Sequence, residues 1–522
     1  MINRFAKISL IILGYLIILS AVANIFDADL GWHLRCGRDT FASAFPYLDT
    51  YTYSYYGQPW TNHEWGGDVL FWAIYSMFGY FTLPILVAAC VWFTLLGAIK
   101  IFFGQLSMAG IIAGIVGAGA VSYLLAPRLA FIVPALLVCL LFTLEKKKYL
   151  FLWPMIIWLW SALHGSWILG FIIINIYLFG NLASIILQKY FPKFASQYSD
   201  WRKKDFTRII FWQIISAAAV CLNPYGWKIW QEVGQYLSPQ YFKLVVNEWL
   251  PSYVFPIYPW PLVIGAVAAV LLAIAYYKKR ATLAQLLLFF AMFFAAWQAK
   301  RQAFYLVVVS LPIIALAAET STEEIKTIFF SEKNINRAKI IIIILATCGC
   351  IFALTKIHFT NDIWSDKEFL TQRELPFGAV AFIKTDSNNK KINIFNEFRW
   401  GGYLNWSLPN ALVYFDGRGT ATWRDEYGKT YLQKYREIKM EAGGLKILNS
   451  SKADYVLLSR STSSVYPRPD WLNRMIFGEN ELQKVFSTDE SQLEKMLKIS
   501  ADWKLIYSDN IARVWKKQLV RE

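Results

Sequence analysis

The sequence predicts a polytopic α-helical membrane protein with about eleven transmembrane helices and an extracytoplasmic α/β domain at its C-terminal end. Three observations lead to this fold class. Of the 522 residues, 56% are hydrophobic and 17% are charged, whereas soluble domains are about 25% charged. Several apolar runs approach the roughly 20 residues that cross a bilayer. From residue 358 the composition becomes that of a soluble domain.

The apolar runs define a transmembrane domain over residues 1–357, with a large first outer loop at 27–78. The first run has no small-residue cleavage site before Asp27, so we expect a retained helix and not a signal peptide. The predicted helices cover 6–26, 79–99, 107–126, 129–144, 149–163, 167–187, 208–222, 260–277, 283–298, 302–318 and 339–356.

The basic residues of this domain fall in alternate loops and thereby predict its orientation. With the N-terminus in the cytoplasm, the inner loops receive Lys100, Lys146 to Lys148 and Lys278 to Arg280, which follows the positive-inside rule. The net charge of +16 is then a property of membrane topology, and nucleic acid is not a predicted partner. The first loop, the stretch 223–253 and the C-terminal domain fall on the outer side.

The C-terminal domain, 358–522, alternates between helix-like and strand-like segments. Apolar residues recur at helical spacing in 432–448 and 490–500. Residues 503–517 are typical of a hairpin that turns near Asp509. The other predicted strands lie in 391–398, 411–418 and 453–460. The six cysteines are scattered, with neither zinc-ligand spacing nor a disulfide framework.

Asp27 and Asp29 directly follow the first apolar run, at headgroup level, where an unpaired carboxylate is costly. One interpretation is that they are capping acids at a helix end. The alternative is functional: the pair could hold a divalent cation such as Mg or Mn, or one acid could act as a general base. His33 follows shortly after the pair.

Histidines and acids recur in the other outer segments. The aromatic stretch 58–72 contains His63 and Glu64 and predicts a helix along the membrane surface, although an aromatic belt with incidental polar groups fits equally. His164 lies at the tip of a helical hairpin in "ALHGSW", where an ordinary loop residue is the simpler interpretation. These side chains are candidates for substrate binding.

Two arginines stand at predicted outer helix ends, and one glutamate lies in a long outer loop. Arg128 and Arg301 either snorkel to lipid headgroups or point inward, where a guanidinium suits a lipid-linked phosphate. Glu248 lies in an outer loop of about 35 residues, a length that is often functional. Asp416 and Arg418 follow a predicted strand, where they form either a sugar or phosphate site or a turn with a salt bridge.

The motifs "DADLGWHLRCGR", "HEWGGDVLF", "LHGSW", "NPYG", "NEW" and "WGGYL...FDGR" resemble the GT-C superfamily of integral-membrane glycosyltransferases, and most closely a bacterial GT-C-like group. The resemblance implies a first-loop catalytic acid, here Asp29 with Asp27 in support. It also implies a polyprenyl-phosphate or polyprenyl-diphosphate sugar donor and inverting transfer outside the bacterial cytoplasmic membrane. "RWGGYL" is similar to the Trp-Trp-Asp-Tyr-Gly signature of oligosaccharyltransferases, but Gly401 and Gly402 replace its second Trp and its Asp. An Asn sequon as acceptor is therefore less expected than another lipid, glycan or protein acceptor.

The rival hypothesis is a non-catalytic scaffold or a transporter for envelope polysaccharide assembly. A transporter should place polar groups near the middle of the bilayer, on broken helices. In this sequence the interiors of the predicted helices carry few ionisable residues, and the polar groups gather at one rim. That distribution favours chemistry at the membrane surface.

Overall fold

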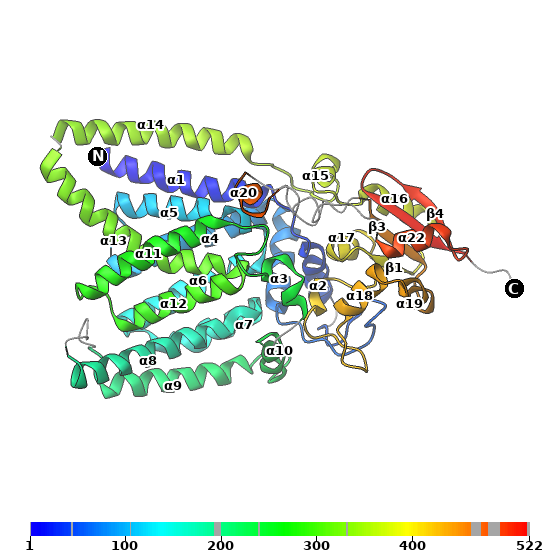
Figure 1. Cartoon of the computed structure of the whole chain (residues 1–522), viewed down its shortest axis with the longest axis horizontal. Coiled ribbons are helices and arrows are strands. Elements are labelled where there is room, and N and C mark those ends of the chain that lie inside the picture. Colours follow the sequence, from blue (N-terminus) through cyan, green and yellow to red (C-terminus); the bar gives the residue numbers. More distant parts are fainter. Residues whose placement is uncertain are drawn as a thin grey trace.

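The chain folds into a helical bundle with an α/β region at one end, and the N-terminus lies at the opposite end of the bundle (Figure 1). The computed structural model describes residues 2–42, 45–104, 106–192, 200–237, 241–329, 332–460, 471–478 and 491–518. The bundle helices run along the long axis and are α1 (Ile2–Ala23), α4 (Thr82–Phe103), α5 (Met108–Val121), α6 (Pro134–Lys146), α7 (Trp153–Leu163), α8 (Ile168–Tyr190), α9 (Lys203–Val220), α11 (Pro259–Tyr277), α12 (Leu283–Gln298), α13 (Ala303–Phe329) and α14 (Glu332–Lys356).

Each predicted membrane segment coincides with one of these helices. Within the described part of the chain, seven helical stretches are long and apolar enough to cross a membrane, and α5, α7 and α12 are shorter apolar helices. The helix α9 opens with Lys203, Lys204 and Asp205, which interrupts its apolar character. Proline in the first turn starts α6, α7 and α11, because the missing N–H is not needed there.

Three helices lie between the bundle and the α/β region: α2 (Leu30–Ala42), α3 (Trp65–Phe78) and α10 (Lys228–Leu237). The helix α2 lies within the predicted first outer loop, 27–78. The outer stretch 223–253 is expected to have no clear structure of its own, and α10 shows that this prediction is wrong. The helix predicted over 58–72 begins only at Trp65. Residues before it turn, since Asn62 Oδ1 accepts a hydrogen bond from the backbone N–H of Glu64 at 3.0 Å.

The α/β region holds a five-stranded sheet in the order β2-β1-β3-β5-β4. The strands β1, β2 and β3 are parallel, whereas β5 runs antiparallel to both β3 and β4. The predicted strands and hairpin are confirmed. The elements are α15 (Lys367–Gln372), α16 (Phe377–Asp386), β1 (Ile392–Asn396), α17 (Gly401–Ser407), β2 (Ala411–Val413), α18 (Tyr431–Met440), α19 (Gly444–Ser450), β3 (Tyr455–Ser459), α22 (Gln492–Ile499), β4 (Trp503–Ser508) and β5 (Ala512–Lys517). The helix α20 (Trp471–Phe477) lies apart from the sheet, beside the bundle, where Asn473 hydrogen-bonds with the backbone of Ile257.

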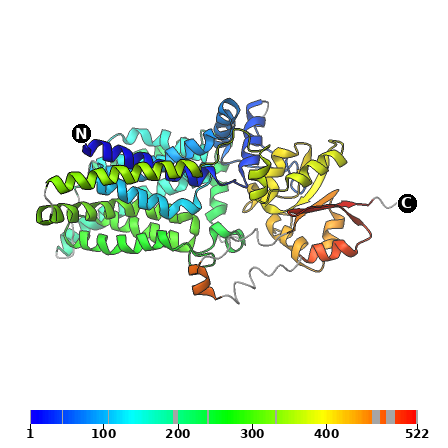
Figure 2. The same cartoon turned by 90° about the horizontal axis from the view of Figure 1, so that it is seen from above.

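Side chains alternate across the sheet and bury both faces. Ile394 and Leu457 pack with residues of α16 and α17, whereas Phe395 and Val456 pack with residues of α18, α19 and α22. Figure 2 shows the sheet with the yellow helices on one side and the orange and red helices on the other. The carboxyl ends of β1 and β2 are therefore free to carry polar residues towards the membrane domain.

The first outer loop belongs structurally to the α/β region as well as to the bundle. Its segment at Tyr51 to Tyr53 pairs with the edge strand β2, because the N–H of Val413 donates to Tyr51 and its carbonyl accepts from Tyr53. Trp32, Tyr51 and Trp60 share a core with Phe415 and Trp423. The loop thus holds the α/β region against the end of the bundle that lies opposite the N-terminus.

We expect that Gly31→Ala lowers the stability of the junction by about 1–3 kcal/mol. A Cβ atom at Gly31 would overlap the carbonyl oxygen of Gly402 in α17, and one at Gly402 would overlap the carbonyl of Ala28. Backbone cannot yield as a flexible side chain does. Thermal unfolding in detergent measures the loss. Gly443→Ala is the matched control, since nothing lies within 4 Å of its added Cβ, and equal shifts for both variants would contradict the close packing.

Candidate functional site

The site lies where the carboxyl ends of β1 and β2 meet the link between α1 and α2. Asp416 follows β2, and Gly417 approaches the Asp29 side chain so closely that a Cβ would overlap its Oδ1 atom. Gly401 packs against Asp416 in the same way. The glycines of "RWGGYL", Gly401 and Gly402, therefore allow the backbone to pack closely against neighbouring residues. Neither position carries the acid of the oligosaccharyltransferase signature.

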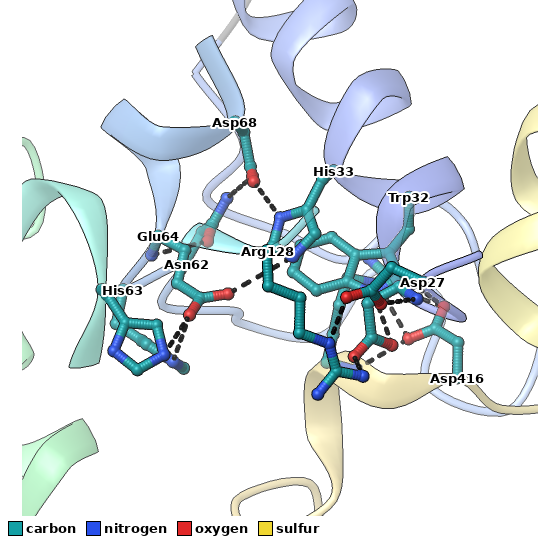
Figure 3. Close-up of polar contacts among 12 residues, drawn as sticks. Asp27, Trp32, His33, Asn62, His63, Glu64, Asp68, Arg128 and Asp416 are labelled. Carbon is teal, nitrogen blue, oxygen red and sulfur yellow. Dashed lines mark hydrogen bonds and ion pairs between the residues drawn. The ribbon is translucent and has the colours of Figure 1, made fainter. Parts of the chain in front are cut away.

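Arg128 is the centre of the membrane-side half of the site. It lies on an extended residue between two short 3-10 helices, Ser122–Leu124 and Leu129–Phe131. Its Nε contacts Asp27, its Nη1 donates to Glu248 Oε2 at 2.8 Å, and its Nη2 lies 3.5 Å from Asp29 Oδ2. Figure 3 shows the guanidinium beside the Asp27 carboxylate. We name Arg128, Asp27, Asp29 and Glu248 the acid–arginine cluster.

The two first-loop acids differ in exposure. The Asp27 side chain is fully buried, whereas that of Asp29 keeps 31% of its surface. Asp27 Oδ1 also accepts the backbone N–H of Asp29 at 2.7 Å, and Asp29 Oδ1 accepts Trp32 Nε1 at 3.1 Å. Burial raises the pKa of Asp29, with a further increase from Asp27 that Arg128 opposes. Of the two first-loop acids, Asp29 is thus the one open to solvent, and Asp27 holds Arg128.

Arg301 extends the cluster on its far side. Its Nη1 lies 3.5 Å from Glu248 Oε1, and its guanidinium stacks over the Trp249 ring at 4.3 Å. Burial alone would raise the pKa of Glu248, but the two arginines outweigh it and lower that pKa. Both predicted arginines therefore point inward, towards acids, and Glu248 joins them.

A second group, the histidine cluster, adjoins the first and consists of His33, His63, Glu64, Asp68 and His164. His33 Nδ1 lies 2.5 Å from Asp68 Oδ1, and its Nε2 lies 3.7 Å from Glu64 Oε2. The other Glu64 oxygen lies 3.2 Å from His164 Nε2 and 4.0 Å from His63 Nε2. Figure 3 shows Glu64 between His63 and His33. Three imidazoles thus surround one carboxyl group.

Burial and neighbouring charges set different pKa values in this cluster. Burial alone would lower the pKa of His33, but the charge and hydrogen bond of Asp68 raise it to about 9. Burial lowers the pKa of His63 to about 4 and that of His164 well below its usual value. Burial raises the pKa of Glu64 to about 7. Near neutral pH, His33 is a cation, His63 and His164 are neutral, and Glu64 exchanges its proton readily.

Replacing Glu64 by glutamine should remove a titration that destabilises the folded chain as pH rises. Because the pKa of Glu64 is raised from 4.5 to about 7, the folded state holds its proton more tightly than the unfolded chain does. The corresponding stability is complete below pH 4.5 and is lost as pH rises through about 7. The unfolding temperature of Glu64→Gln, relative to wild type, should therefore increase between about pH 5 and about pH 8.

The neighbours that face Glu64 are His33, Asp68, Asp29 and Arg301, with the two neutral histidines. Glu368→Gln is the matched control, because Glu368 lies exposed on α15. A difference between Glu64→Gln and wild type that stays constant over this pH range would contradict the raised pKa.

Asp416 and Arg418 form a buried ion pair. Arg418 Nη2 donates to Asp416 Oδ2 at 2.7 Å and its Nη1 to Asp49 Oδ1 at 2.8 Å. All three side chains have no exposed surface, and the rings of Tyr51, Trp60 and Trp423 surround the guanidinium. This is the turn-and-salt-bridge alternative, and it positions Gly417 beside Asp29.

The structure brings the predicted site residues into two adjoining clusters, with Asp416 and Arg418 behind them. Sequence reasoning missed Asp49 and Glu232 as partners. It identifies Asp68 beside His63 and Glu64 in the stretch 58–72, but it does not pair this acid with His33. Asp49 and Glu232, which lies 3.9 Å from His63, carry no local signal in the sequence.

Asp27 and Asp29 do not fit a divalent cation as they stand. Within the described part of the chain, no group of three or more His, Cys, Asp or Glu side chains could hold a metal ion. Both Asp27 oxygens and both Asp29 oxygens already face N–H donors. The donor set is that of a charge-paired guanidinium site.

A helical bundle whose first loop carries acids, covered on that side by a C-terminal α/β region, is an architecture that this chain shares with solved membrane-protein structures. Among solved structures, the chain is similar to the oligosaccharyltransferase of the archaeon Archaeoglobus fulgidus. No family model matches the sequence, and no curated protein matches it.

Three structures of that archaeal protein show the extent of the similarity. For the apo form, the TM-score is 0.55 at 13% identity, over 87% of this chain and 69% of the other. The form tethered to an acceptor peptide with the NVT sequon gives 0.53 at 14%, over 99% and 74%. The archaeal AglB complex with an inhibitory peptide and a dolichol-phosphate gives 0.52 at 12%, over 99% and 74%. At these identities the likeness establishes the fold.

Proposed function

We propose that this chain is an inverting membrane glycosyltransferase that uses a polyprenyl-phosphate-linked or polyprenyl-diphosphate-linked sugar donor. The acceptor is a hydroxyl of a lipid, glycan or protein on the outer face of a bacterial cytoplasmic membrane. All eleven bundle helices cross the bilayer in this proposal, with the N-terminus in the cytoplasm. Residues 1–357 form the transmembrane domain and 358–522 the extracytoplasmic domain.

The observation that carries the proposal is the inward orientation of Arg128 and Arg301 at the outer rim of the bundle. Both contact the same carboxylate, Glu248, and Arg128 also contacts Asp29. Guanidinium groups bind phosphate oxygens through paired hydrogen bonds. A phosphate between these arginines would stand directly beside the exposed acid.

An apolar groove supports a lipid-linked donor. It encloses about 320 Å³ between α5, α11 and α13, and Val116, Ile264 and Leu311 are among the side chains that line it. The helix α13 begins two residues after Arg301, and α5 ends seven residues before Arg128. A polyprenyl tail in this groove would bring its phosphate to the two arginines while the sugar remains in water.

In the transfer step, the acceptor oxygen forms a bond to the anomeric carbon as the bond from that carbon to the donor phosphate breaks. Attack from the opposite side inverts the anomeric configuration. Asp29 orients the acceptor hydroxyl or takes its proton, and the leaving phosphate keeps the electron pair beside Arg128 and Arg301. The sugar is bound on the side of the site lined by His33, His63, Glu64 and His164. The ion pair of Asp416 and Arg418 holds Gly417 in place beneath this sugar-binding region, next to Asp29.

The bound molecules of the similar structures agree with this proposal. An archaeal structure contains a dolichol-phosphate together with an inhibitory peptide, and another carries a tethered acceptor peptide. A lipid phosphate is the leaving group of the proposed reaction, and an acceptor is its second substrate.

The test uses the full chain in nanodiscs, supplied with bacterial polyprenyl-linked sugars and envelope acceptors. We expect release of polyprenyl phosphate, or of polyprenyl diphosphate from a diphosphate-linked donor, together with a new glycoside whose anomeric configuration proton NMR assigns as inverted. Mass spectrometry of glycolipids and glycans from a strain that lacks the gene identifies the acceptor. A scaffold or transporter would give no release from any donor, and a retained configuration would contradict the inverting step.

A further inference from the structure

One guanidinium contacts three carboxylates in the acid–arginine cluster, and the carboxylates come from two distant segments of the chain. The three nitrogens of Arg128 contact Asp27, Asp29 and Glu248 separately. Carboxylate oxygens from separate segments that converge on one point are the usual surroundings of a hard divalent cation. In this chain the point of convergence is a side-chain cation.

All six carboxylate oxygens of the cluster face N–H donors. Asp27 accepts from Arg128 and from the backbone N–H of Asp29, and Asp29 accepts from Trp32 and faces Arg128. Glu248 accepts from Arg128 at 2.8 Å and faces Arg301 at 3.5 Å. A carboxylate that ligates a metal must direct an oxygen lone pair at the ion, and these oxygens are directed at nitrogen.

The charges of the cluster agree with this arrangement. Three carboxylates meet two guanidinium groups, which leaves one net negative charge among the five side chains. Arginine keeps its charge at all pH values where proteins are folded, and the carboxylates raise the pKa of Arg128 further against the effect of its burial. The cation at this position is therefore permanent and cannot be lost to a chelator.

We propose that Arg128 takes the place of a divalent cation in this site, so that sugar transfer proceeds without a metal ion. The inference rests on the proposed function, because it concerns the cation that meets the donor phosphate. Arg128 and Arg301 neutralise the leaving phosphate, and the acids hold the two guanidinium groups in position. It follows that removal of the Arg128 side chain should leave carboxylate oxygens that can bind a divalent cation in its place.

The first measurement needs no substrate and uses Mn²⁺ alone as the probe. Electron paramagnetic resonance of free Mn²⁺ reports binding to the purified full chain in detergent. Wild type should leave Mn²⁺ free, whereas Arg128→Ala should bind one ion per chain, because Asp27 and Asp29 are then left without their cation and Glu248 keeps only Arg301. The additional change Asp29→Asn in the Arg128→Ala background should remove that binding.

Arg38→Ala is the matched control for the substitution itself. It also removes an arginine from beside an acid, since Arg38 pairs with Asp39 at 2.9 Å on the exposed side of α2, and it should leave Mn²⁺ free. Arg128→Met, which fills similar space without an N–H donor, provides a second variant if the alanine variant unfolds. Stoichiometric binding of Mn²⁺ by wild type would overturn the inference, and so would the absence of binding in both folded Arg128 variants.

The second measurement uses turnover. EDTA should leave the rate of polyprenyl phosphate release by wild type unchanged, and added Mn²⁺ or Mg²⁺ should not increase it. Loss of release in EDTA with recovery in Mn²⁺ would overturn the inference while it supports the proposed function. If no donor is turned over, the proposed function fails, and the Mn²⁺ binding measurement still decides whether Arg128 replaces a cation.

Discussion

Replacing Arg418 by methionine should destabilise the folded chain by about 3–5 kcal/mol, the usual cost of breaking a buried ion pair. Asp49 and Asp416 have no exposed side-chain surface, so both would remain buried without a cation. The aromatic rings around Arg418 cannot replace its hydrogen bonds. Unfolding by heat or denaturant in detergent measures the loss, and the α/β region should be affected first.

Arg38→Met is the matched control for this prediction. Arg38 also pairs with an aspartate, but its side chain is 39% exposed and that of Asp39 is 36% exposed. Exposed pairs of this kind contribute about 0.2–1 kcal/mol. Similar small losses for the two arginines would show that the Arg418 ion pair does not hold the α/β region to the first loop.

Replacing Asp29 by asparagine should reduce sugar transfer by about 100-fold to 10,000-fold, the usual range for a lost general acid or base. The unfolding temperature should stay near that of wild type, because the amide oxygen of the new side chain can still accept from Trp32 and Asp27 still holds Arg128. Release of polyprenyl phosphate in nanodiscs measures the rate, and the KM for the acceptor shows whether orientation is lost with it.

Asp27→Asn separates the two acids. Asp27 is fully buried against Arg128, so its loss should lower both the unfolding temperature and the rate. If Asp29→Asn turns over as wild type does while Asp27→Asn does not, the catalytic assignment of Asp29 is wrong. If both variants retain full turnover, the first-loop acids take no part in the reaction.

Much of the fold could be predicted because its signals are local. An apolar run of sufficient length predicts a membrane helix wherever it occurs, and each predicted run is helical. The alternation of β1 and the turn before β5 are equally local. The distribution of basic residues also predicts that the loops carrying Arg128 and Glu248 lie on the same side of the membrane. Their direct contact is compatible with that prediction.

The helix α2 could not be predicted by the same rules. Residues Leu30 to Gly37 are all buried, polar and apolar side chains alike. The helix therefore has no alternation of an apolar and a polar face, which is the sequence pattern that identifies an amphipathic helix. The polar side chains among them are buried because they have partners far away in the chain. Arg35 donates to the carbonyls of Asn405 and Pro409, and His33 pairs with Asp68.

The partners of the site acids were hidden for a related reason. Arg418 donates a hydrogen bond to Asp49, which lies 369 positions away in the sequence. The sequence around each residue contains no pattern that predicts this pairing. The pKa values of the histidine cluster depend on the burial of first-loop residues against the segment that contains His164. This burial arises only in the folded chain, so the sequence does not predict the pKa values.

The pairing of the first outer loop with β2 also bears on how the protein is made. Ribosomes release the segment Tyr51 to Tyr53 long before the strand that it joins, β2, and α17 is made almost as late. The first loop therefore lacks these partners while about 350 further residues are synthesised. Until β2 and α17 are made, Gly417 and Gly402 cannot pack against Asp29 and Ala28, so an incomplete chain holds only half of the candidate site.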